Sequence, residues 1–213
     1  MSNVSVIIRN RNEERWIGHA IQSAVDFFDK PEIIIVDNNS TDNSRRVIST
    51  FDYLDIKSYN VDYYTPGISL NLGVSKASND TILILSAHCV ITECNLTKIN
   101  TLLKKNAAVW GKQIPIWNGK KVSRRYIWSN FGEEDKTNYY SKDEDRYFLH
   151  NALCFYDRQF LFDNPFDEKL SGKEDRYWAI DIINKGYDYY YDGINQQCNH
   201  FYTNNGATWK GIG

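Results

Sequence analysis

The first ninety residues alternate between short apolar runs and amphipathic stretches. Residues 4–8 and 32–36 are nearly continuous runs of aliphatic, mostly β-branched side chains, which is typical of parallel strands buried on both faces. Between them, apolar residues recur at helical spacing from Trp16 to Phe28 and predict an amphipathic helix. A helix capped by Ser40 or Thr41, a strand over 56–59, a helix over 68–77 and a strand over 81–85 should follow. Strands and helices in alternation predict the α/β class, with a mostly parallel central sheet and helices on both faces.

The pattern changes after residue 95. A helix is expected over 96–103, extended chain over 107–117, a strand over 148–158, a helix over 172–187 that ends at Gly186, and a last strand over 187–193. Residues 119–146 are polar, charged and aromatic without a clear period, so they predict a long functional loop. We expect one domain over 1–213, with a nucleotide-sugar-binding half (1–95), an acceptor half (96–195) and a flexible C-terminal tail (196–213).

Composition narrows the possible functions only modestly. Hydrophobic residues make up 42% and charged residues 24% of the 213 positions, which is an ordinary globular balance and argues against disorder. The net charge of −2, with basic residues not gathered in one stripe, leaves no electrostatic footprint for nucleic acid. The 15 Tyr and 6 Trp suit a protein that handles sugars or bases, although aromatic residues also fill cores.

The sequence contains no apolar run near the roughly 20 residues of a membrane span, and its first residues do not resemble a signal peptide. Its four cysteines show no CxxC pair, so they are expected to be mostly buried thiols. These features predict a cytoplasmic location, with peripheral contact at the inner face of a membrane if the acceptor is lipid-linked.

Polar residues concentrate where the strands end. The loop 37–42 offers six polar side chains at the carboxyl edge of the expected sheet, where α/β folds bind ligands. Helix capping explains Ser40 to Asp42 well and Asp37 poorly, so Asp37 is a candidate for contacting a base or ribose. No GxGxxG or GxxxxGK[ST] motif follows a strand, so a glycine-rich phosphate cradle is excluded.

Several ordered segments resemble family 2 glycosyltransferases of the GT-A fold. VSVIIRNRNEERWIGHAIQSAV and EIIIVDNNSTDNS resemble the family's opening, LNLGVSKASNDTILILSAH its Asn-x-Gly helix and metal-motif strand, and FDEKLSGKEDRYWAIDIINKGYDYYY its FDE…GxED…GY segment. The resemblance covers about residues 4–191. It implies a GT-A fold and an inverting transfer from a nucleotide sugar, with release of the nucleoside diphosphate.

The resemblance also implies residue roles. Asp175, in the pair Glu174-Asp175, would be the general base that deprotonates the acceptor hydroxyl, and Glu174 belongs to the same catalytic pair. Stabilisation of a helix N-terminus is the competing explanation for these carboxylates. The expected donor site consists of Arg9, Asn10, Arg11, Asn12, Glu13, Asp37, Asn39, Asn71, Ser86, Ala87 and His88. On the acceptor side we expect His150, Asn151 and Trp178.

The sequence departs from the family at two places. Arg9, Asn10 and Arg11 replace the usual Pro-x-Tyr after the first strand. Ser86-Ala87-His88 replaces the usual Asp-x-Asp, which holds Mn²⁺ or Mg²⁺. His88 falls on the second acidic position, and His200 resembles a C-terminal histidine that some GT-A enzymes fold back onto the metal.

Three explanations of His88 follow. His88 and His200 would hold Mn²⁺ together with phosphate oxygens, since imidazole suits Mn²⁺ and later metals whereas Mg²⁺ prefers oxygen. Alternatively, no metal binds, and a histidinium with Arg9 or Arg11 offsets the charge of the leaving diphosphate. In the third explanation His88 is a core histidine. A zinc site that adds Cys89 and Cys198 is disfavoured by its spacing.

The sequence thus predicts an inverting glycosyltransferase with a nucleotide-sugar donor and a glycan or lipid-linked acceptor, of the kind used in surface polysaccharide synthesis. Two alternatives remain open. One is a nucleotidyltransferase that builds nucleotide sugars, although RNRNEER lacks that class's glycines. The other is a binding module that has lost catalysis, which the missing carboxylates at 86 and 88 would favour.

Overall fold

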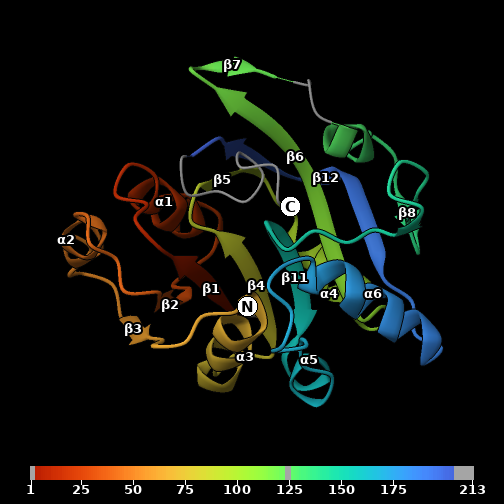
Figure 1. Cartoon of the computed structure of the whole chain (residues 1–213), viewed down its shortest axis with the longest axis horizontal. Coiled ribbons are helices and arrows are strands. Elements are labelled where there is room, and N and C mark those ends of the chain that lie inside the picture. Colours follow the sequence, from red (N-terminus) through yellow and green to blue (C-terminus); the bar gives the residue numbers. More distant parts are fainter. Residues whose placement is uncertain (1–2, 123–125, 204–213) are drawn as a thin grey trace.

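The computed structural model describes residues 3–122 and 126–203 of the 213-residue chain. Its centre is a mixed sheet in the order β3-β2-β1-β4-β11-β6-β12-β5, with β7 and β8 as short additions to β6 and β12 (Figure 1). The first half comprises β1 (Val4–Asn10), β2 (Glu32–Asp37), β3 (Ile56–Asn60) and β4 (Thr81–Ser86), all parallel. The predicted order of elements in residues 1–86 is confirmed.

The second half of the sheet mixes directions. Its strands are β5 (Cys89–Glu93), β6 (Ala108–Trp117), β11 (Leu153–Asp157) and β12 (Tyr190–Phe201). β11 runs antiparallel to both β4 and β6, whereas β12 runs parallel to β6 and antiparallel to β5. The carboxyl ends of β1, β2, β4, β6 and β12 therefore lie along one edge, together with the start of β11.

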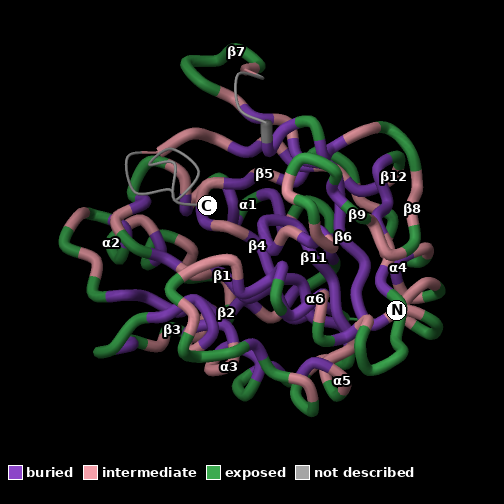
Figure 2. The backbone as a smooth tube through the Cα atoms, turned by 45° about the vertical axis from the view of Figure 1, so that its right-hand side comes forward, coloured by how far each residue is buried: buried purple, intermediate pink, exposed green. Residues whose placement is uncertain are grey.

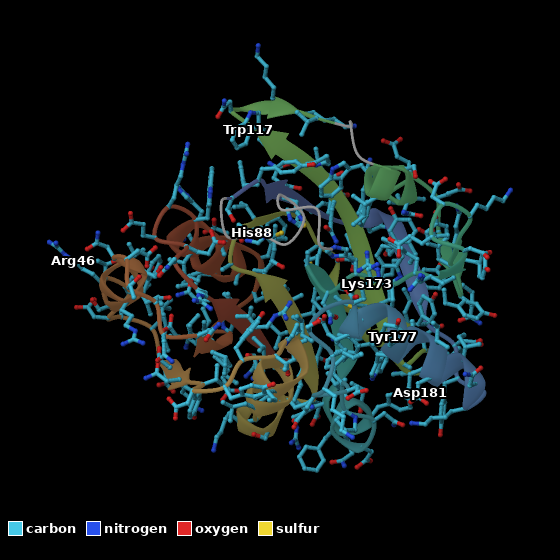
Figure 3. The ribbon with its side chains drawn as sticks, viewed as in Figure 1. Arg46, His88, Trp117, Lys173, Tyr177 and Asp181 are labelled. Atoms are coloured by element: carbon cyan, nitrogen blue, oxygen red, sulfur yellow. The ribbon has the colours of Figure 1, made fainter. Side chains whose placement is uncertain are left out.

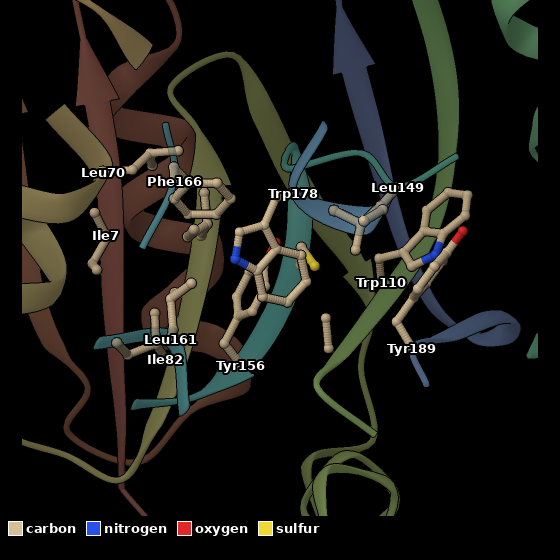
Figure 4. Close-up of a cluster of buried hydrophobic side chains, with 14 of the residues drawn as sticks. Ile7, Leu70, Ile82, Trp110, Leu149, Tyr156, Leu161, Phe166, Trp178 and Tyr189 are labelled. Atoms are coloured by element: carbon tan, nitrogen blue, oxygen red, sulfur yellow. The ribbon is translucent and has the colours of Figure 1, made fainter. Parts of the chain in front are cut away.

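Helices cover both faces of this sheet, as predicted. α1 (Ile17–Phe27), α2 (Ser44–Ser49) and α4 (Leu96–Leu103) pack on one face around Ile8, and α3 (Pro66–Lys76), α5 (Arg158–Asp163) and α6 (Glu174–Asn184) pack on the other around Ile7. Figure 4 shows the second cluster, in which Trp178 of α6 lies with Tyr156 and Phe166. In Figure 2 the buried residues follow the central strands, and the exposed ones gather in the helices and loops around them.

The expected loop over 119–146 contains short elements instead of one excursion. These are β7 (Lys120–Lys121), the 3₁₀ helix η1 (Tyr126–Asn130), β8 (Lys136–Thr137) and β9 (Tyr140–Ser141), and β10 (Arg146–Tyr147) follows directly. β6 and β7 form a hairpin around Asn118 and Gly119, whose φ angles of 48° and 73° fit a two-residue hairpin turn. The hairpin projects from the body of the molecule (Figures 1 and 2).

The expectation of a flexible tail from residue 196 is wrong for residues 196–201. Residues 196–201 belong to β12, which inserts between β6 and β5, because Gln197 to Phe201 pair with Lys112 to Ile116. The strand also continues past a break in register between Asp192 and Gln197, so it extends beyond its predicted end at residue 193. Residues 204–213 lie outside the described residues.

Candidate functional site

Asp37 lies at the carboxyl end of β2, opposite Asn10 in β1, and is 3% exposed. Its Oδ1 accepts hydrogen bonds from the Ser40 amide and from Nε and Nη2 of Arg45, and its Oδ2 accepts from the Asn10 amide and the Ser40 hydroxyl. Burial alone would raise the pKa of Asp37, but these donors outweigh it and lower the pKa. Asp37 is thus an ionised anchor for the ends of two strands.

The loop after β1 is fastened to the loop after β2. Oδ1 of Asn12, a residue with φ at 53°, accepts a hydrogen bond from the backbone N–H of Thr41 at 2.7 Å. The backbone N–H of Asn12 donates to the Ser40 hydroxyl at 2.9 Å. Ser40 and Thr41 are therefore occupied here, and α2 begins only at Ser44, so the predicted cap is wrong. Asn39 is exposed at φ 50° and donates to the Val61 carbonyl, while Arg11 is exposed.

His88 follows β4 in a two-residue link to β5, after half-buried Ser86 and buried Ala87. Figure 3 shows it between α1 and β6. Its Nε2 lies 3.2 Å from Nε2 of His200, which stands near the end of β12. Two residues 112 positions apart thereby meet at one point of the sheet edge.

The outer nitrogen of each ring already faces an acceptor. Nδ1 of His88 lies 3.2 Å from Oε1 of Glu13, and Nδ1 of His200 lies 2.8 Å from Oε1 of Gln113. Because an ionised carboxylate only accepts, Nδ1 of His88 carries the hydrogen. Burial, with His88 and His150 nearby, lowers the pKa of His200 well below its ordinary value. A neutral His200 that donates through Nδ1 turns the lone pair of its Nε2 toward His88.

This arrangement fits a metal ion bound by two imidazoles. Two ligands at about 2.1 Å from one ion lie about 3.0–3.4 Å apart for bond angles of about 90–110°. Hydrogen bonds that fix the outer nitrogens are the usual support of metal-binding histidines. Among the described residues, however, no group of three or more His, Cys, Asp or Glu side chains is placed to hold a metal. Any ion here would need further ligands from a substrate.

The start of β11 brings His150 and Asn151 to the same edge. The rings of His150 and His200 lie 6.0 Å apart between centroids. Burial, then the cations Arg176 and Arg9 and the neighbouring His88, lower the pKa of His150 well below its ordinary value. Asn151 donates its backbone N–H to Oδ2 of Asp175 at 3.0 Å and accepts the Tyr156 hydroxyl at 2.6 Å. These two residues lie between the histidine pair and the first turn of α6.

Glu174 and Asp175 open α6 and are both buried. Glu174 lies 3.3 Å from Nη1 of Arg9, the residue before Asn10 in β1. Asn10 in turn donates to Asp37 at 2.8 Å. Adjacent residues of one strand therefore link the carboxylate pair of α6 to the carboxylate that closes β2, so Arg9, Asn10 and Asp37 lie at the same edge as that pair.

Two predicted site residues are placed elsewhere. The Asn71 amide is occupied by the backbone of Phe166, donating to its carbonyl at 2.9 Å and accepting its N–H at 3.0 Å. Trp178 is 3% exposed, and its indole donates to the Asn164 carbonyl at 2.7 Å. Asn71 thus holds the loop before α6, and Trp178 belongs to the core. We leave both out of the site proposed below.

Sequence reasoning missed three residues that hold the site together. They are Gln113, which fixes His200, Arg45, which pairs with Asp37, and Arg176, which pairs with Asp175. Only Arg176 carried a signal, because a cation directly after two buried acids is a natural partner for them. Gln113 lies 87 positions from His200 along the chain. Arg45 lies in α2, a helix that looks solvent-exposed from its sequence.

Some of the buried polar atoms without a partner lie at this edge. Within residues 3–122 and 126–203 they include Oδ1 of Asn10, Nδ2 of Asn38, Nε2 of Gln113 and Nδ2 of Asn151. Buried polar groups are normally satisfied, so these atoms are consistent with a polar ligand at the edge. A hollow of about 470 Å³, lined by residues such as Phe28 and Tyr53, lies instead at the opposite end of β2.

Comparisons with known proteins bear on the family and the fold. The sequence profile of glycosyl transferase family 2 matches residues 5–170. No curated protein matches the chain. No helix of the described residues is long and apolar enough to cross a membrane.

Similar solved structures include S. aureus TarS 1–349 in complex with UDP-GlcNAc, at a TM-score of 0.70 and 19% identity, over 96% of this chain and 60% of that one. TarS 1–349 in complex with UDP gives 0.68 and 20% identity, over 92% and 60%. GalNAc-T7 with UDP, GalNAc and Mn²⁺ gives 0.71 and 16% identity, over 95% and 44%. The chain thus spans less than two thirds of the length of each of these proteins. At such identities the likeness shows the fold, and the profile match shows the family. The protein belongs to glycosyl transferase family 2 and has the GT-A fold.

Proposed function

We propose that the protein transfers a glycosyl group, with inversion, from a nucleoside diphosphate sugar to a hydroxyl of a glycan or lipid-linked acceptor in surface polysaccharide synthesis. The observation that carries this proposal is the single edge shared by the Asp37 network, the His88–His200 pair and the Glu174–Asp175 pair. In this proposal the Asp37 network contacts the nucleotide, and the histidine pair lies beside the diphosphate. The carboxylate pair of α6 lies beside the acceptor hydroxyl.

In this proposal the donor nucleotide lies along the ends of β1 and β2, beside Asp37, Asn10 and the loop from Arg11 to Glu13. His150 and Asn151 would border the acceptor. One carboxylate of the α6 pair takes the proton of the acceptor hydroxyl as its oxygen attacks the anomeric carbon, and the family resemblance assigns this role to Asp175. The bond to the diphosphate breaks on the opposite side, which inverts the configuration.

His88 and His200 would hold a divalent ion, with Mn²⁺ preferred over Mg²⁺ because the protein offers nitrogen. A bound cation there would offset the negative charge of the diphosphate. The chain's own contribution is to keep both rings oriented through Glu13 and Gln113. GalNAc-T7, which shares the fold, was crystallised with UDP and Mn²⁺. We further propose that the protein works in the cytoplasm and meets lipid-linked acceptors at the membrane surface.

The test is a thermal-shift screen of the nucleoside diphosphates, each with and without Mn²⁺, followed by assays of the matching nucleotide sugars. A ligand at 100 times its Kd should raise stability by about 2.7 kcal/mol through mass action. UDP is the first compound to test, given the UDP complexes of TarS. Stabilisation by one diphosphate, followed by release of that diphosphate from its sugar conjugate, supports the proposal. Release of pyrophosphate from a nucleoside triphosphate would instead indicate a nucleotidyltransferase.

A second candidate function is a binding module without catalysis. The replacement of both usual carboxylates by Ser86 and His88 favours it. It predicts tight nucleotide binding and no turnover of any nucleotide sugar, with or without added metal.

A further inference from the structure

The hairpin formed by β6 and β7 projects from the body of the molecule, and Trp117 lies on it (Figures 1 and 3). Trp117 pairs with Lys120 across the turn, and Ile116 pairs with Lys121. The turn is open, because a Cβ added at Gly119 would have no neighbouring heavy atom within 4 Å. We call residues 117–121 the hairpin tip. None of them belongs to the proposed donor or acceptor site.

The hairpin tip carries two cations. Lys120 and Lys121 are both exposed, and neither forms an ion pair with any residue that the structure describes. The Lys112 ammonium, hydrogen-bonded at 2.7 Å, lowers the pKa of exposed Glu133, and the charge of Lys121 adds a smaller effect. Glu133 therefore already has a cation of its own. Over residues 120–125 the sequence has four basic residues and no acidic one, although 123–125 lie outside the described residues and are not part of the surface proposed below.

An indole ring accompanies the lysines. Trp117 is 37% exposed. Since residues opposite each other share a face of the hairpin, its ring lies on the face of Lys120, and Lys121 lies on the other face. The ring of Tyr202 meets that of Trp117 edge-on at 6.4 Å between centroids, and the Tyr202 hydroxyl accepts from the indole of Trp128 at 2.6 Å. Trp117 is thus supported from the body of the protein and still open to solvent.

The hairpin begins at the edge that holds the candidate site. Pro115 of β6 is the register partner of His200, so Trp117 lies two residues beyond the level of the histidine pair. At ~3.3 Å per residue, the base of the hairpin is about 7 Å further along the strand. A surface that contacts the hairpin tip would therefore lie beyond the same edge of the sheet as the candidate site.

From these features we infer that the hairpin tip docks the protein on a membrane surface that contains anionic phospholipids. Lysines near such a surface are attracted to the lipid headgroups, and tryptophan prefers the interface between headgroups and acyl chains. Because each face of the hairpin carries one lysine, an approach tip first brings both ammonium groups to the headgroups. The inference rests on the proposed function, in which the acceptor is lipid-linked and docking holds the candidate site near it.

Flotation of the full chain with vesicles, in the absence of any nucleotide sugar, measures docking directly. Vesicles of phosphatidylcholine alone are compared with vesicles that also contain phosphatidylglycerol. We expect binding to the anionic vesicles only, and loss of this binding between about 0.1 M and 1 M salt, because the Debye length falls from ~10 Å to ~3 Å. Lys120→Gln combined with Lys121→Gln should weaken binding about 10- to 30-fold. Brominated lipids should quench tryptophan fluorescence in the wild type, and Trp117→Phe should lose most of this quenching.

The matched control is Lys104→Gln combined with Lys105→Gln. These lysines are exposed after α4, ahead of the start of β6, whereas the hairpin tip follows its end. The control variant changes the net charge by the same amount and should bind vesicles like the wild type. Melting curves and UDP titration should match the wild type in both double variants, which checks that a loss of docking is not a loss of folding.

Equal binding to neutral and anionic vesicles, equal losses in the two double variants, or no binding by the wild type would each overturn the inference. Binding of dextran sulfate through Lys120 and Lys121 without vesicle binding would assign the hairpin tip to an anionic polymer and also overturn it. Turnover of a nucleotide sugar by a chain that binds no vesicle overturns the docking surface alone. Vesicle binding by a chain that turns over no nucleotide sugar overturns the proposed function and leaves the docking surface in place.

Discussion

The Nε2 atoms of His88 and His200 lie 3.2 Å apart, each on a ring whose other nitrogen is held by Glu13 or Gln113. Two imidazoles whose outer nitrogens carry the hydrogens present both Nε2 lone pairs to one point, where they can hold a cation. We therefore expect Mn²⁺, Co²⁺ or Zn²⁺ to raise the melting temperature in the presence of nucleoside diphosphate, and Mg²⁺ to do so far less.

Calorimetric titration of UDP with metal or with EDTA checks this expectation. His88→Ala and His200→Ala should each abolish the metal-dependent part of the affinity. His19→Ala, on the exposed side of α1, is the matched control and should leave the affinity unchanged. Equal support by Mg²⁺, or intact metal dependence in both variants, would contradict a site built on imidazole.

Asp37→Asn should weaken both the fold and nucleotide binding. The substitution removes the charge that accepts from Arg45, Ser40 and Asn10, and hydrogen bonds to charged groups contribute about 1.5–3 kcal/mol. We expect a loss of about 1–3 kcal/mol in urea unfolding and a higher Kd for UDP. Asp52→Asn, at an exposed position, controls for the change in net charge. Wild-type affinity in Asp37→Asn would remove this network from the donor site.

Asn71→Ala should destabilise the protein without changing donor affinity. It leaves the N–H of Phe166, in the loop that leads to α6, without its acceptor, at a cost of about 1–3 kcal/mol. Urea unfolding measures this loss, and UDP titration of the folded variant should match the wild type. Ser75→Ala, one turn later on an exposed part of α3, should change stability little. A large increase in Kd would return Asn71 to the donor site.

Stability should fall in acid partly through Glu32. Burial alone would raise the pKa of Glu32, but hydrogen bonds from Lys57, Ser5 and Ser78 outweigh it and lower the pKa from 4.5 to about 2. A carboxyl with a depressed pKa stabilises the folded state above pH 4.5, and this contribution is lost as the pH falls toward 2. Melting temperatures of Glu32→Gln should therefore converge with the wild type between these two values. A constant difference across that range would show that Glu32 does not titrate as expected.

The alternation of strands and helices could be read from the sequence because each early strand is apolar throughout and each helix has one apolar stripe. Leu96 to Leu103, for example, forms a helix with the predicted bounds. The Asp37 loop was also recognisable, since six polar residues exceed what one helix cap needs. These features depend on neighbours along the chain.

Features that depend on distant residues were not readable in this way. Nothing near Asn71 indicates that it binds a backbone segment 95 positions away, and the glycine-rich sequence after residue 196 gave no sign of a strand. Trp178 illustrates a third limit, because an aromatic residue beside a catalytic motif fits a sugar platform and a core equally well. Only the packing against Tyr156 and Phe166 separates the two.

The irregular stretch of β12 between Asp192 and Gln197 determines to which face of the sheet each later side chain of the strand points. Side chains alternate between the two faces of a strand, so the number of residues in this stretch decides on which face His200 emerges. Deleting one residue there would turn the imidazole away from His88 without altering either histidine. A length change far from the chemistry would then act like a substitution of the histidine itself, so insertions and deletions at this point should be tolerated only in pairs.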